Sequence, residues 1–165
     1  MLARPDVGAE LVHVLAEGGS GGEVRLFRQA LRRSVLDRFL PDLARSARQP
    51  TVRALAAKCL IERRARWLEG YRWALTDYQY GRRHRRPQFA ERPIDTDLAP
   101  LPLIEAAARD RAAPVRRVAA DGLILLRDQL TGKEPVLALL ENDARETIRE
   151  RIAFVRQKLA ERAAS

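Results

Sequence analysis

Arginine and aromatic side chains concentrate in one segment of this 165-residue sequence, residues 63–92. The segment holds nine of the 28 arginines, three acidic residues and six of the nine aromatic residues. Arginine beside aromatic rings is typical of protein-binding hot spots. It is also typical of single-stranded nucleic-acid sites, where rings stack on bases and guanidinium groups bind phosphates. The segment therefore indicates recognition of a partner. The residues expected to contact it are Trp73, Tyr78, Tyr80, Arg82, Arg83, Arg85 and Arg86.

Residues that could catalyse a reaction are sparse. The two histidines, His13 and His84, lie far apart in the sequence, and neither has a second ligand at metal-binding spacing. The single cysteine, Cys59, excludes an intramolecular disulfide and a multi-cysteine zinc site. The sequence contains neither a phosphate-binding loop nor a Gly-x-Ser-x-Gly elbow. We therefore expect no catalytic, cofactor-binding or metal-binding residues, and we predict that the protein is not an enzyme.

The overall composition narrows the class of protein. Apolar residues make up 46% and charged residues 32%, which favours an ordered chain over a disordered one. The net charge of +9 favours an anionic partner: nucleic acid, anionic lipid or an acidic protein. No apolar run reaches the ~18–20 residues of a membrane span. The first residues lack the pattern of a signal peptide, so we expect a cytoplasmic protein.

Helical spacing of apolar residues dominates the sequence. Val52 and Val115 each begin a run of apolar residues at positions i, i+3, i+4, i+7 and i+8. Residues 52–61 and 115–124 also align with each other position by position, and weaker copies begin near residues 24 and 148. Self-similarity at multiples of about 30 residues is typical of a helical repeat array. The pattern predicts an all-α protein.

The two aligned segments carry the pattern Pro-x-Val-Arg-x-x-Ala-Ala-x-x-Leu. Residues 50–60 fit it closely, and residues 114–123 fit it with the proline one place nearer the valine. The pattern resembles the second helix of HEAT repeats, including the short bacterial type. The resemblance implies a single domain over residues 1–165, an α–α superhelix of about four helix pairs. It also implies that the arginine after each valine, Arg53 and Arg116, faces an acid of a neighbouring turn or repeat and is structural.

The resemblance also places the remaining helices. The first helices of the two central units would be residues 35–47 and 101–111. Degenerate copies at the two ends would pair residues 7–17 with 23–33, and residues 135–142 with 144–163.

Along the sequence, the two aligned segments begin about two repeat lengths apart. Helical spacing continues past residue 61 through Trp67, Leu68, Tyr71 and Leu75 as far as Tyr78. It predicts one helix of about 25–28 residues, followed by an extended loop rich in arginine and proline. Residues 63–100 are therefore expected to form an extended helix and a basic loop, inserted in the middle of the array.

These features together predict a non-enzymatic binding or scaffold protein that recognises a protein partner, or a second copy of itself, through the arginine and aromatic patch. The alternative is nucleic-acid binding through the same patch; no membrane or small-molecule partner is expected. A remote alternative is DNA glycosylase activity. If Trp73 and Asp77 lie on one helix face, they resemble the tryptophan and aspartate that line the site of the HEAT-like alkylpurine DNA glycosylases. The chain is short for that family and has no second tryptophan on a later repeat.

Overall fold

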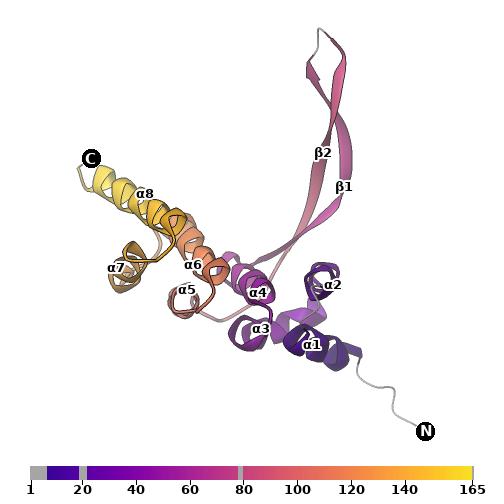
Figure 1. Ribbon diagram of the computed structural model, residues 1–165, viewed down its shortest axis with the longest axis horizontal. Coiled ribbons are helices and arrows are strands. Elements are labelled where there is room, and N and C mark those ends of the chain that lie inside the picture. The colour runs from indigo at the N-terminus through magenta and orange to yellow at the C-terminus, as the bar shows by residue number, and fades with distance from the viewer. Residues whose placement is uncertain (1–6, 19–21, 78–79, 165) are drawn as a thin grey trace.

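The computed structural model describes residues 7–18, 22–77 and 80–164. Within these ranges the chain forms eight α-helices, one 3₁₀ helix and two strands. The helices form a body, and the two strands form a hairpin that projects from it (Figure 1). The elements are α1 (Val7–Glu17), α2 (Gly22–Ala30), η1 (Ser34–Phe39), α3 (Leu40–Ser46), α4 (Pro50–Glu62), β1 (Arg64–Asp77), β2 (Arg82–Pro93), α5 (Pro100–Ala108), α6 (Ala113–Leu126), α7 (Glu134–Glu141) and α8 (Glu146–Ala163).

Helix α4 lies in the middle of the body and contributes to two hydrophobic cores. Val52 and Leu60 join the core formed with α1, α2, η1 and α3. Ala54 and Ile61 join the core formed with α5 to α8. Gly122 permits the close approach of α6 to α4, because a Cβ atom there would lie 3.0 Å from a side-chain carbon of Ile61. A helix with neighbours on both sides needs apolar residues around most of its circumference.

The same arginine contact occurs twice in the body. Arg53 of α4 donates to both carboxylate oxygens of Asp110 at 2.8 and 3.0 Å. Arg116 of α6 donates to both oxygens of Asp143 at 2.6 and 3.1 Å. Each arginine also donates to two backbone carbonyls of the loop before its own helix. The expectation that Arg53 and Arg116 each face an acid is confirmed.

The prediction of an all-α, HEAT-like superhelix is wrong. Outside residues 63–100 the expected segments are helical, although η1 replaces the start of the segment at 35–47. Residues 64–77 and 82–93 instead form the two antiparallel strands of a hairpin, β1 and β2, in place of the expected extended helix and long basic loop. The chain is a mostly helical protein with a prominent β-hairpin, which we call the arm.

The helix prediction failed because a bulged strand mimics helical spacing. Helix α4 ends at Glu62, and the next residue, Arg63, has a left-handed backbone with φ of 53°, a conformation that glycine or asparagine usually supplies at a helix end. The register of β1 then shifts between Leu68 and Gly70, so Leu68 and Tyr71 lie on one face of the hairpin although they are three residues apart. An offset of three is also a helical offset, so the spacing of apolar residues in the bulged strand was interpreted as that of a helix.

Candidate nucleic-acid interface

The arm is anchored to the body at its base by Arg92. The Arg92 guanidinium donates to both carboxylate oxygens of Asp37 in η1 at 2.7 and 2.6 Å. It also donates to the carbonyl oxygens of Leu31 and Arg33, at 2.9 and 3.0 Å. The hydrogen bond with Asp37 raises the pKa of Arg92 despite its partial burial. This bidentate contact fixes the end of β2 against the body.

Apolar contacts complete the anchor. Ala65 at the start of β1 and Ile94 just after β2 are buried in the same core as α1 to α4, and Trp67 packs against that core. Beyond this point the arm leaves the body, as Figure 1 shows. The 14 residues of β1 correspond to a length of about 45 Å at ~3.3 Å per residue. Since an isolated two-stranded hairpin is only marginally stable in water, the contacts at the base contribute to the stability of the arm.

The register divides the arm into two faces. Strand β2 has no bulge, so its alternate residues point to opposite sides, and each residue of β1 shares the side of its partner. One side, the ring face, combines aromatic and apolar residues with arginine. It consists of Arg66, Leu68, Tyr71, Trp73, Leu75, Arg83, Arg85, Pro87, Phe89 and Glu91. The other side, the polar face, carries Arg72, Arg82, His84, Arg86 and Gln88 on the projecting part of the arm.

Three rings of the ring face are open to solvent. Tyr71 is 57% exposed, Trp73 61% and Phe89 50%, which are high values for large aromatic residues. The Arg85 guanidinium lies 5.4 Å from the ring centre of Tyr71 and 5.7 Å from that of Trp73. The Arg66 guanidinium lies 4.3 Å from the ring centre of Phe89. The ring face therefore holds cations directly above aromatic surfaces.

The structure brings most of the predicted contact residues together on the arm. Trp73, Arg83 and Arg85 lie on the ring face, and Arg82 and Arg86 lie on the polar face. Tyr80 lies in the turn and is exposed, while Tyr78 lies outside the described residues. The glycosylase-like pair depended on a helix face, and Trp73 and Asp77 lie in a strand instead.

The prediction omitted Arg66, Tyr71, Arg72 and Phe89, which belong to the same surface. A sequence signal for two strands was present. Aromatic and apolar residues alternate at positions 71, 73 and 75, and arginine stands at 83 and 85. Alternation of this kind predicts strands, and Gly81, with φ of +62° in the turn, could have joined them.

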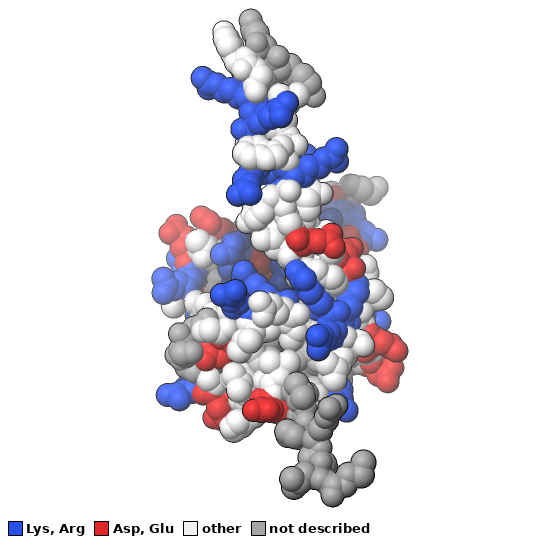
Figure 2. All heavy atoms as spheres, turned by 90° about the vertical axis from the view of Figure 1, so that its right-hand side faces the viewer, with Lys and Arg blue, Asp and Glu red and all other residues white. Residues whose placement is uncertain are grey.

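Most arginines of the arm differ from many in the body: apart from Arg64 and Arg92 at the base, they have no acidic partner among the described residues. Body pairs include Arg151 with Asp121 at 2.6 Å and Arg162 with Asp128 at 2.6 Å. Within the part of the chain that the structure describes, six arginines of the arm form no ion pair. In Figure 2 the projecting arm shows basic and uncharged side chains, and acids gather on the body and near the base. We call the six the arm arginines: Arg66, Arg72, Arg82, Arg83, Arg85 and Arg86.

A groove lies between the base of the arm and helices α2 and α4. Its volume is ≈ 580 Å³, and its walls include Leu68 and Phe89 of the ring face. The opposite wall contributes the cations Arg28 and Lys58, and Glu62 forms ion pairs with Lys58 at 3.3 Å and Arg64 at 3.1 Å. The groove is thus continuous with the ring face and has a basic rim.

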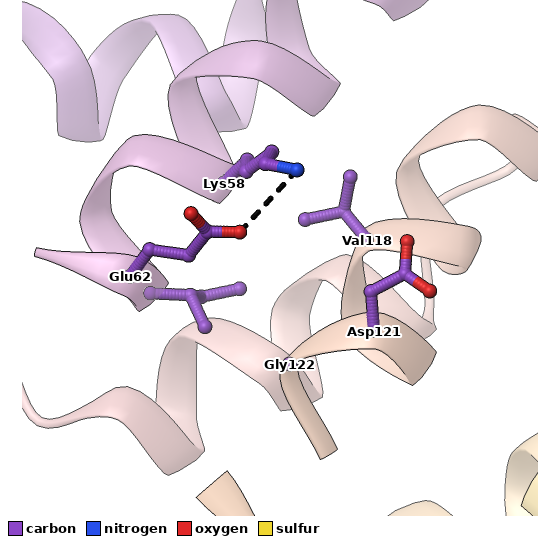
Figure 3. Close-up of a pocket in the computed structure, with 6 residues that line it drawn as sticks. Lys58, Glu62, Val118, Asp121 and Gly122 are labelled. Atoms are coloured by element: carbon purple, nitrogen blue, oxygen red, sulfur yellow. Dashed lines mark ion pairs between the residues drawn. The ribbon is translucent and has the colours of Figure 1, made fainter. Parts of the chain in front are cut away.

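Groups that could act in catalysis are poorly placed for it. Burial, reinforced by the charge of Glu62, raises the pKa of Cys59 to about 12, so the thiol is not a nucleophile at neutral pH. The small hollow between α4 and α6 in Figure 3 has a volume of ≈ 10 Å³, enough for about one water molecule. No cluster of three or more metal-ligating side chains occurs among the described residues. No helix in the same ranges is long and apolar enough to cross a bilayer.

Comparisons of the chain with models of protein families, with curated proteins and with solved structures give no match.

Proposed function

We propose that this protein is a non-enzymatic nucleic-acid-binding protein that uses the arm as its binding element. The observation that carries the proposal is the set of six arm arginines: none has an ion-pair partner among the described residues, and all except Arg66, which lies at the base, project beyond the body. Arginine binds phosphate through two parallel N–H donors. A two-stranded ribbon is also narrow enough to enter the major groove of DNA, so the arm has a shape that nucleic acid can accept.

The charge distribution supports nucleic acid over a protein partner. Residues 63–92 carry +6 of the net charge of +9 in under a fifth of the chain. Two arms of this charge would repel each other, which disfavours self-association through them. A partner protein would need a matching acidic surface, whereas every nucleic acid offers a regular series of phosphates.

The exposed apolar side chains of the ring face favour a second candidate function, protein recognition. Leu68 is 40% exposed and Leu75 is 45% exposed, beside the three rings. Contiguous apolar patches on a protein surface often mark protein interfaces. Binding of this kind would depend only weakly on salt, because apolar contacts release no counterions.

Fluorescence anisotropy of labelled oligonucleotides, measured at low and moderate salt, tests the proposal. Replacing four arginines of β2, the set Arg82, Arg83, Arg85 and Arg86, with glutamine should strongly weaken binding. The matched control replaces four exposed body arginines, Arg25, Arg48, Arg111 and Arg145, and removes the same charge. The control protein should bind almost as well as the original. Absence of oligonucleotide binding by the original protein at low salt would contradict the proposal and favour a protein partner.

A further inference from the structure

We infer that the ring face of the arm binds single-stranded nucleic acid, with bases stacked on Tyr71, Trp73 and Phe89 and phosphates held by Arg66 and Arg85. The inference rests on the proposed function and adds to it which form of nucleic acid the arm recognises. A duplex conceals the faces of its bases inside the stack, whereas a single strand exposes them to aromatic side chains.

The spacing of the rings suits an extended strand. Tyr71 and Trp73 are two residues apart on β1 and point to the same side. Two residues correspond to about 6.6 Å along a strand, roughly twice the ~3.4 Å between stacked bases in a duplex. Neighbouring rings can therefore each receive a base only if the bases have separated. Phe89 lies across the hairpin, opposite Leu68, and extends the same surface toward the body.

The arginines above these rings are available to phosphates. Arg66 stacks over Phe89, and Arg85 lies over Tyr71 and Trp73, but within the described residues neither guanidinium has an ion pair. A contact between a cation and an exposed ring is weaker than the stacking of a base on that ring. An incoming base can therefore displace the guanidinium, which then lies beside the phosphate of the same nucleotide.

The groove at the base of the arm continues the path of the strand. Tyr71, Pro87 and Phe89 line both the ring face and the groove of ≈ 580 Å³. Arg28 and Lys58 stand on the groove's other wall. A strand that leaves the rings toward the body therefore meets Arg28, and also Lys58, which lies 3.3 Å from Glu62; both are cations that complement phosphates.

The test compares a labelled oligothymidylate of about 15 nucleotides with a duplex of equal length, using the full chain. Replacing all three rings with leucine (Tyr71→Leu, Trp73→Leu, Phe89→Leu) keeps apolar side chains on the strands but removes the stacking surfaces. Affinity for the single strand should fall about 100-fold or more, and affinity for the duplex should change little. The matched control is Phe154→Leu on α8, where an exposed ring also has a cation, Lys158, 5.7 Å from its centre.

Two further measurements separate stacking from hairpin stability. Tyr71→Phe and Trp73→Phe retain the rings and should keep the affinity for the single strand within about threefold. Trp67→Phe leaves Trp73 as the only tryptophan, whose fluorescence should be quenched when the oligothymidylate is added. Loss of affinity in the ring-retaining variants, or unchanged fluorescence on binding, would overturn the inference.

The outcomes distinguish this inference from the proposed function. If the leucine variant binds the single strand as tightly as the original protein, or if the original protein prefers the duplex, the inference is wrong and nucleic-acid binding by the arm arginines remains. If the original protein binds neither oligonucleotide at low salt, both proposals are wrong.

Discussion

Neutralising the four outer arginines of β2 should change the salt dependence of nucleic-acid binding by a predictable amount. For single strands, the logarithm of the binding constant falls with the logarithm of salt concentration, with a slope of about −0.7 for each phosphate neutralised. If the bound strand reaches both faces of the narrow arm and all six arm arginines contact phosphates, the slope is about −4. Raising the salt from about 50 to about 200 mM would then weaken binding about 300-fold.

Replacing Arg82, Arg83, Arg85 and Arg86 with glutamine leaves two arm arginines, Arg66 and Arg72. The expected slope is then about −1.4, and the same rise in salt weakens binding only about sevenfold. Glutamine keeps a long polar side chain on each strand position, so the hairpin should persist. Anisotropy titrations at four or five salt concentrations give both slopes, and circular dichroism checks that the helix content is unchanged.

The body variant with the same loss of charge decides how the result is interpreted. Replacing Arg25, Arg48, Arg111 and Arg145 should leave the slope near −4, because these residues lie outside the arm. An equal decrease of the slope in the two variants would mean that general charge, rather than the arm, attracts the nucleic acid. A slope near zero in the original protein would refute the reasoning altogether.

Three further predictions concern the body and the anchor. Asp143→Asn should lower the free energy of unfolding by about 3 kcal/mol in urea denaturation, because it leaves the Arg116 guanidinium largely buried without its carboxylate. The hydrogen bond from Arg116 also lowers the pKa of Asp143. The ionised Asp143 therefore stabilises the folded protein above the unfolded-state pKa of ~4, and this stabilisation is lost as the pH falls through the lowered pKa of the folded state. Asp143→Asn should accordingly lose stability less steeply than the original protein below about pH 4. Gly122→Val should destabilise by about 1–3 kcal/mol, whereas Gly122→Ala should be nearly neutral, since its better helix propensity offsets the tight contact with α4. Arg92→Gln should loosen the base of the arm, seen as a red shift of Trp67 fluorescence without loss of helix content; an unchanged spectrum would mean that apolar contacts alone hold the arm.

The helices of the body could be predicted because their information is local. The apolar spacing that begins at Val52 and Val115, each after a proline, corresponds to α4 and α6. The roles of Arg53 and Arg116 were also predictable, but their partners were not. Asp110 and Asp143 lie 57 and 27 residues farther along the chain, and only folding brings them within hydrogen-bond distance.

The arm shows where local patterns fail. The sequence by itself determined that arginine and aromatic residues are concentrated in residues 63–92, and most of the contact residues it suggested lie on the arm. It did not determine whether those residues form a helix or a strand, because the bulge after Leu68 lets one pattern fit both.

Only the tertiary structure decided between them. Each strand of the hairpin needs the other for its backbone hydrogen bonds. The bidentate contact between Arg92 and Asp37 joins positions 55 residues apart in the sequence. Which rings share a face with which arginines follows from that pairing register, and a register is a property of two segments together.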